Sequence, residues 1–155
     1  MNEKQEEFLE QYLSTLSQAE RDSIPQFLAE YFCGDEYNAN ECARLIDNRI
    51  KRASCSLKVV YELENEPLPE VGRITVVLNW NQEPVCIVRL TEVSICPFSK
   101  VTREFAESEG EGDGSYEWWR EAHIGFFTMH AKEIGKTFNE SSELVLERFQ
   151  KVFPQ

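Results

Sequence analysis

The feature that most constrains the fold is a pair of β-branched runs in the middle of the chain. Residues Ile74 to Leu78 and Val85 to Val93 are rich in valine and isoleucine, and the polar segment Asn79 to Glu83 separates them. Two such runs joined by a short polar segment predict a β-hairpin. A later run, Leu144 to Phe153, predicts a last strand. The chain therefore needs a sheet of several antiparallel strands.

The start of the chain has helical patterns instead. Apolar residues recur at helical spacing over about the first 16 residues, which predicts an amphipathic helix. Ser17 with Glu20 carries the signature of a capping box, and apolar residues continue at helical spacing to Gly34, so we expect a second helix there. Residues 1–34 are therefore expected to form a helical N-terminal extension.

Further helices are predicted between the strands. Asn38 with Glu41 repeats the capping signature and predicts a third, short helix that leads to Lys51. Residues 54–62 fit a strand around their start and a helical turn later, and both interpretations stay open. We expect a helix from Ser99 to Ser108, and another that begins after Ser115.

These elements together predict an α+β fold. The chain has 155 residues, of which 41% are hydrophobic, enough for one core, so we expect a single domain over residues 1–155. Regular alternation of strands and helices is missing, which favours a small, curved or barrel-like sheet flanked by helices over a doubly wound fold. No apolar run long enough to span a membrane and no secretory signal is visible, so we expect a soluble, cytoplasmic protein.

The charge is strongly acidic but uneven. The net charge is −12, which opposes non-specific binding of extended duplex DNA or other long polyanions. Residues 44–58, however, carry a net charge of about +4, because five basic side chains accompany the single acid Asp47. One basic patch is therefore expected on an acidic protein.

The cysteines and histidines do not have the spacing of a metal site. Five cysteines are widely separated, and the two histidines stand seven residues apart. No pair of cysteines has the two-residue spacing of a zinc knuckle. We expect reduced, mostly buried thiols, no bound metal and no cofactor.

The basic patch contains a candidate catalytic pair. Lys51 and Ser54 are three residues apart, so a tight turn would let both side chains converge on one small ligand. A lysine of lowered pKa can take a proton from a hydroxyl, and Arg49, Arg52 and Lys58 would add positive potential. The alternative is that these are solvated basic residues at a helix end, where they favour the helix dipole.

A second candidate is the segment Glu109 to Ser115, which places three carboxylates among three glycines just before a predicted helix. Such a loop can present an acid to a ligand, or it can be an acidic connector. The helix that follows carries an aromatic stripe, which more often belongs to a core than to a base-stacking site. Its members are Trp118, Trp119, Phe126 and Phe127. We expect His123, on the face of Trp119, to be an interior or edge histidine.

Three blocks of this sequence together resemble the ASCH domain, a relative of the PUA RNA-binding fold. The first block runs from Arg49 to Leu57 and contains the lysine turn. The others resemble motifs of the longer members of the family, and the likeness spans Asn38 to Phe153. They comprise Tyr61-Glu62, Glu66 to Pro69 and Val71-Gly72, and then Glu104 to Ala106, Glu109 to Asp113, Ser115, Trp119-Arg120 and His123.

The resemblance implies a small PUA-like β-barrel flanked by helices, with the lysine turn and the acidic block meeting at a cleft. A small bacterial member is similar to an amidohydrolase that removes the acetyl group from N4-acetylcytidine. Carried over by motif, Lys51 would be the general base, Ser54 the nucleophile, and Glu109 the group that orients the lysine or protonates the leaving amine. The usual glycine two residues before the lysine is Arg49 here. The substrate or RNA would contact Arg49, Arg52, Ser56, Glu111, Asp113 and Ser115.

Two other functions stay open. The domain could be an RNA-binding module, or a ribonuclease, in which the basic patch contacts phosphate groups. It could also be an interaction protein that docks through residues 1–34. The partner that we expect is a small nucleoside or a short single-stranded RNA, and neither a membrane nor duplex DNA.

Overall fold

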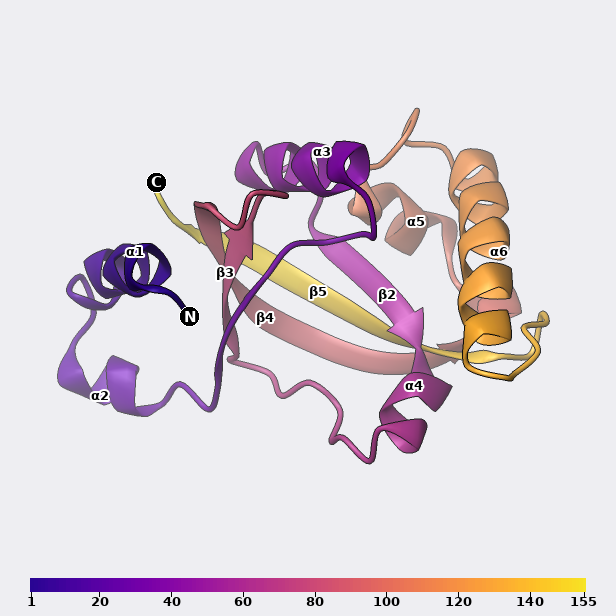
Figure 1. The fold of residues 1–155 in the computed structure, drawn as a ribbon, viewed down its shortest axis with the longest axis horizontal. Helices are drawn as coiled ribbons and strands as arrows, with labels where there is room; N and C mark the ends of the chain where they lie inside the picture. Colours follow the sequence, from indigo (N-terminus) through magenta and orange to yellow (C-terminus); the bar gives the residue numbers. More distant parts are fainter. The chain divides into compact units, whose positions relative to one another are not determined.

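The structure is a computed structural model that describes residues 1–155. It contains one five-stranded mixed sheet with the strand order β1-β3-β4-β5-β2, together with the helices labelled in Figure 1. The chain divides into two compact units, and the long strands β4 (Pro84–Pro97) and β5 (Glu143–Phe153) contribute residues to both. The first unit consists of Met1–Arg52, Glu70–Thr91 and Phe149–Gln155, and the second of Ala53–Pro69 and Glu92–Arg148.

The first unit contains the predicted hairpin. β3 pairs antiparallel with β4, with Val76 opposite Ile87, as the β-branched runs predicted. A shorter strand, β1, pairs with β3 in parallel. The elements of this unit are α1 (Glu3–Leu13), α2 (Gln18–Asp22), β1 (Phe27–Glu30), α3 (Glu36–Asp47), β3 (Ile74–Leu78) and the first part of β4.

Both faces of β3 are covered, which is why all five of its residues are buried. Successive side chains of a strand point to opposite faces. Val76 accordingly belongs to a cluster with Leu9 and Leu13 of α1, and Val77 to a separate cluster with Ile46 of α3. The two helices thus supply the apolar cover of the hairpin in this unit.

The predicted second helix is wrong beyond its first turns. The capping box of Ser17 and Glu20 is confirmed, but α2 ends at Asp22. Pro25 follows, and a proline supplies no backbone N–H for continuing a helix. Residues Phe27–Glu30 form β1 instead, so the first 34 residues hold two helices and a strand.

The second unit resolves the segment that fitted both a strand and a helix. Its first residues form β2 (Ala53–Leu57), which pairs antiparallel with β5, and α4 (Lys58–Leu63) follows without a break. The segment therefore contains both a strand and a helix, and the helix follows the strand. The unit also contains the rest of β4 and β5, the 3-10 helix η1 (Phe98–Lys100), α5 (Arg103–Glu109) and α6 (Tyr116–Glu133).

Two helix starts differ from the predictions. α3 begins at Glu36, three residues before the expected point, because the Asp35 carboxylate accepts the N–H of Asn38 at 2.9 Å and caps the helix. Ser99 lies in η1, and Thr102 caps α5. Side chains of this kind can cap at several neighbouring positions, and the sequence alone does not choose among them.

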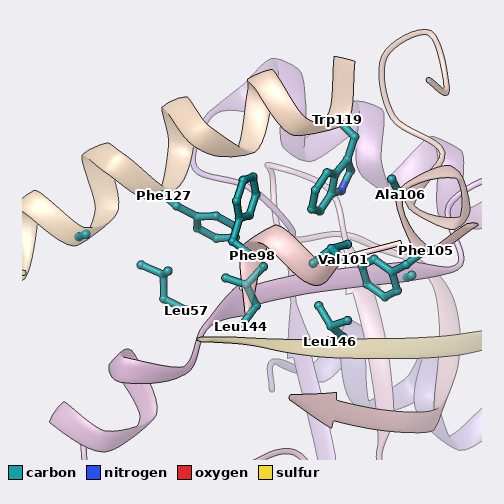
Figure 2. Close-up of a cluster of buried hydrophobic side chains, with 11 residues drawn as sticks. Leu57, Phe98, Val101, Phe105, Ala106, Trp119, Phe127, Leu144 and Leu146 are labelled. Atoms are coloured by element: carbon teal, nitrogen blue, oxygen red, sulfur yellow. The ribbon is translucent and has the colours of Figure 1, made fainter. Parts of the chain in front are cut away.

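The core of the second unit is aromatic. Figure 2 shows Phe98 packed between Trp119 and Phe127 of α6, with Leu144 and Leu146 of β5 beneath them. The ring of Phe98 stacks on that of Trp119 with centroids 5.6 Å apart. This packing fixes the face of α6 that carries Trp119.

The α+β fold flanked by helices, with a helix at the N-terminus, confirms the predicted class. None of the helices combines the length and apolarity that crossing a membrane requires. The expectation of one domain over residues 1–155 stays a prediction.

Candidate functional site

The centre of the candidate site is the buried carboxylate of Glu109, the last residue of α5. It is only 1% exposed, and its Oε2 accepts the indole N–H of Trp119 at 2.7 Å. The thiol of Cys55 donates to the same oxygen at 3.2 Å. A buried carboxylate is costly unless hydrogen bonds satisfy it, so these donors determine where the group can lie.

His123 lies one helical turn after Trp119 and completes this arrangement. Its ring stacks on the indole with centroids 4.5 Å apart, and its Nδ1 is 2.7 Å from the Trp119 carbonyl oxygen. Since a carbonyl oxygen only accepts, Nδ1 carries a hydrogen and donates it. The other nitrogen, Nε2, therefore faces Glu109 Oε2, 3.5 Å away.

This orientation has a chemical consequence for Glu109. An unprotonated Nε2 and an ionised carboxylate are both acceptors and cannot hydrogen-bond to each other. The contact is favourable only when a proton sits on one of them, as an imidazolium beside a carboxylate or as a carboxylic acid beside a neutral ring. The pair can therefore hold one proton at a buried position.

The alternation of β2 decides which of its side chains meets Glu109. Ala53, Cys55 and Leu57 pack on the core side. Ser54 and Ser56 consequently lie on the opposite side, where Ser56 Oγ is 3.5 Å from Tyr61 Oη. Cys55 contacts Glu109, and Ser54 makes no hydrogen bond to it.

The acidic loop after Glu109 is built around a helix cap. Ser115 caps α6 by accepting the N–H of Trp118 at 3.1 Å. The hydroxyl and the backbone N–H of Ser115 bind the Asp113 carboxylate, and these hydrogen bonds lower the pKa of Asp113 below its ordinary value. Asp113 and Ser115 thus have a local structural role, while Glu111 is half-buried.

A glycine in this loop is required by its surroundings. Gly112 has a φ of 60°, and a Cβ there would lie 2.2 Å from ring atoms of Trp118. Any side chain would displace the indole, because real Cβ atoms do not approach so closely. The glycine of the acidic motif is thus explained by packing against α6.

The aromatic stripe of α6 is divided between core and surface. Trp119 and Phe127 are buried, as predicted for a core. Trp118 and Phe126 are 39% and 52% exposed, so the expectation of a core position is wrong for these two. Neighbouring helical residues differ by about 100° in direction, and only one of each adjacent pair can face the core.

Arg49, Lys51 and Arg52 of the basic patch lie in the first unit, whereas Lys58 lies in the second. α3 ends at Asp47, and Arg49 follows in the left-handed conformation with φ 61°. Glycine adopts this conformation most easily, which accounts for the glycine usual at this place in the ASCH motif. Arg49 and Arg52 are exposed, whereas Lys51 is only 2% exposed.

Of the three proposed catalytic residues, Lys51 belongs to the first unit, and Ser54 and Glu109 to the second. Their joint role stays a prediction. The sequence interpretation missed Cys55, Trp119 and His123 as neighbours of Glu109. The spacing of four between Trp119 and His123 was the available signal for two of them.

Cys55, Glu109 and His123 are the side chains in this unit that could reach a metal ion together. Donor atoms of Cys55, Glu109 and His123 all lie within 4.8 Å of one another. Thiolate, carboxylate and imidazole suit zinc chemically. The indole N–H of Trp119 already occupies the Glu109 oxygen, however, and the expectation that no metal is bound stays a prediction.

Comparison with known proteins identifies relatives of this chain. A family model described as the ASCH domain matches residues 29–153. A solved ASCH domain from Lactobacillus crispatus JV V101 is 49% identical, with a TM-score of 0.94, and the alignment covers 97% of this chain and 95% of that one. A structure from Enterococcus faecalis V583 is 28% identical, with a TM-score of 0.83 and coverage of 98% and 90%. No curated protein matches.

Proposed function

This chain belongs to the ASCH domain family, as its motifs predicted. We propose that it binds a nucleoside or a short single-stranded RNA segment. We further propose that it hydrolyses the amide bond of an N-acylated nucleoside such as N4-acetylcytidine. Domains of this PUA-like fold are often associated with RNA binding. The observation that carries the proposal is the buried Glu109 carboxylate, which Trp119 orients and His123 faces.

The proposed reaction cleaves an amide in two steps. In the assignment by motif, Lys51 accepts the hydroxyl proton of Ser54, and the serine oxygen attacks the acetyl carbon, although Ser54 and Glu109 lie on opposite sides of β2. The bond from that carbon to N4 breaks as Glu109 delivers a proton to the departing nitrogen. Water then hydrolyses the acyl ester, which releases acetate and restores the hydroxyl group.

The environment of Glu109 supports its part in this reaction. The contact between His123 Nε2 and Glu109 Oε2 is favourable only when the pair holds a proton, and the departing nitrogen needs such a proton. His123 Nε2 lies 3.5 Å from Oε2, so the proton of this pair can sit on either partner. Trp119 keeps the carboxyl group in one orientation.

The test measures cytidine and acetate released from N4-acetylcytidine by chromatography. We expect Glu109→Gln, Lys51→Ala and Ser54→Ala each to lower kcat about 100-fold or more. Glu107→Gln is the matched control, because this exposed carboxylate lies on the same helix. Cys55→Ser tests whether the thiol beside Glu109 is needed. An inactive wild-type protein with all acylated nucleosides, or full activity in Glu109→Gln, contradicts the proposal.

A second candidate is RNA binding without chemistry, and the exposed Arg49 and Arg52 favour it. Contacts to phosphate groups release counterions, so affinity for a short single-stranded RNA should fall steeply with salt concentration. Replacing both arginines by alanine should weaken binding and flatten that salt dependence. Turnover of a neutral nucleoside should change little with salt, which separates the two functions.

A further inference from the structure

Two cysteines of the first unit, Cys33 and Cys42, are in contact. Cys33 lies in the loop between β1 and α3, and Cys42 lies within α3. Their Sγ atoms are 3.3 Å apart, although the residues are nine positions apart in sequence. No disulfide bond joins them. A disulfide bond is about 2.05 Å long, so the two sulfur atoms need to approach by about 1.2 Å.

We propose that Cys33 and Cys42 form a reversible disulfide, which makes the first unit responsive to thiol oxidation. This property goes beyond the function proposed above. Cys33 is exposed and can meet an oxidant, whereas Cys42 is 2% exposed and lies beside Cys33. That combination resembles an attacking thiol with a buried resolving thiol.

The oxidant is a small disulfide such as oxidised glutathione. The Cys33 thiolate attacks one sulfur, releases one glutathione thiolate and forms a mixed disulfide. The Cys42 thiolate then attacks Cys33 Sγ and displaces the second glutathione thiolate. The two cysteine protons pass to the released thiolates, so two cysteine thiols become one disulfide and one oxidised glutathione becomes two reduced molecules.

The loop has room for the movement that the bond requires. Cys33 has a φ of 71°, and Gly34 follows it. A Cβ built on Gly34 would meet nothing within 4 Å, so the surroundings of the loop are open. α3 begins only after its cap at Asp35, and the helix can therefore stay in place while Cys33 moves.

The other thiols are less suited to oxidation. Burial raises the pKa of Cys86, in the same unit, to about 12, so it is not a thiolate at neutral pH. In the second unit, burial raises the pKa of Cys96, and the Cys55 thiol donates to Glu109. The contact between Cys33 and Cys42 is thus the site at which oxidation should occur first.

Peptide mass spectrometry tests this proposal on the whole protein. Trypsin cleaves after Arg21 and Arg44 and leaves both cysteines in one peptide. After treatment with oxidised glutathione, we expect this peptide to be about 2 Da lighter and to resist alkylation in denaturant, and a dithiol should restore both thiols. The melting temperature should rise by about 5 °C on oxidation, because the bond closes a short loop.

Matched variants separate the outcomes. Cys33→Ser and Cys42→Ser should each abolish the lighter peptide and the rise in melting temperature, while Cys96→Ser should keep both. The proposal is overturned if wild-type Cys33 collects glutathione while Cys42 stays available for alkylation. It is also overturned if both thiols of the peptide remain reduced, or if either pairs with another cysteine.

Discussion

Replacing Trp119 by phenylalanine removes one of the two hydrogen-bond donors to the buried Glu109 carboxylate and keeps an aromatic ring in its place. The indole N–H lies 2.7 Å from Glu109 Oε2, and hydrogen bonds to charged groups contribute about 1.5–3 kcal/mol. Trp119 is 1% exposed and stacks on Phe98, so the smaller ring also loses packing worth about 1–2 kcal/mol. We expect the free energy of unfolding to fall by about 3–4 kcal/mol.

Urea unfolding followed by far-ultraviolet circular dichroism measures this loss without relying on tryptophan fluorescence. Trp118→Phe is the matched control, and since that side chain is 39% exposed, it should cost less than about 1 kcal/mol. In a Glu109→Gln background, Trp119→Phe should cost about 1 kcal/mol less than in the wild type, because a neutral amide accepts a weaker hydrogen bond. Equal losses for Trp118→Phe and Trp119→Phe would refute the role given to the indole N–H.

Three further predictions concern stability and can be checked by denaturant unfolding. Arg49→Gly should raise the free energy of unfolding by about 0.5–1 kcal/mol, because Arg49 has a φ of 61°, which glycine adopts without strain. A lower free energy of unfolding would show that contacts of the Arg49 side chain outweigh this backbone strain. Gly112→Ala should cost about 1 kcal/mol more than Gly114→Ala. Both glycines have positive φ, but only the Cβ at Gly112 would overlap Trp118, and equal costs would contradict the clash. Burial raises the pKa of Cys86 from 9.0 to about 12, so the unfolded chain loses this proton at a lower pH than the folded protein does. The free energy of unfolding should therefore fall as the pH rises from 9.0 to about 12. Cys86→Ala should show a smaller fall, and equal falls in the two proteins would contradict the burial of this thiol.

The parts of the fold that follow from neighbouring residues were predictable. The β-branched runs on either side of Asn79 to Glu83 gave the hairpin correctly. β1 was missed because it has only four residues and their apolar spacing also fits a helix. Its partner lies far along the chain, with Phe27 opposite Ile74, and no local pattern encodes such a pairing. Pro25 was the one local signal against a continued helix.

Within the candidate site, the sequence predicted the acidic residue Glu109 but not the side chains that contact it. Glu109 stood out because the acidic motif resembles that of the ASCH family. Cys55 was overlooked because the register of β2 against β5 determines which side of the strand faces the carboxylate. His123 was expected to be structural, and its value as a proton partner depends on a hydrogen bond to the Trp119 carbonyl that only the folded helix provides.

The surroundings of Glu109 also determine the order in which the site assembles during synthesis of the chain. The carboxylate belongs to α5, its partners come from β2 and α6, and Cys55 and Glu109 are 54 residues apart. During synthesis, the strand and the acid emerge before Trp119 and His123, so the nascent chain holds a carboxylate whose indole donor does not yet exist. A chain cut short before α6 lacks that donor altogether, and the chemistry proposed for Glu109 therefore starts only after the last helix has packed.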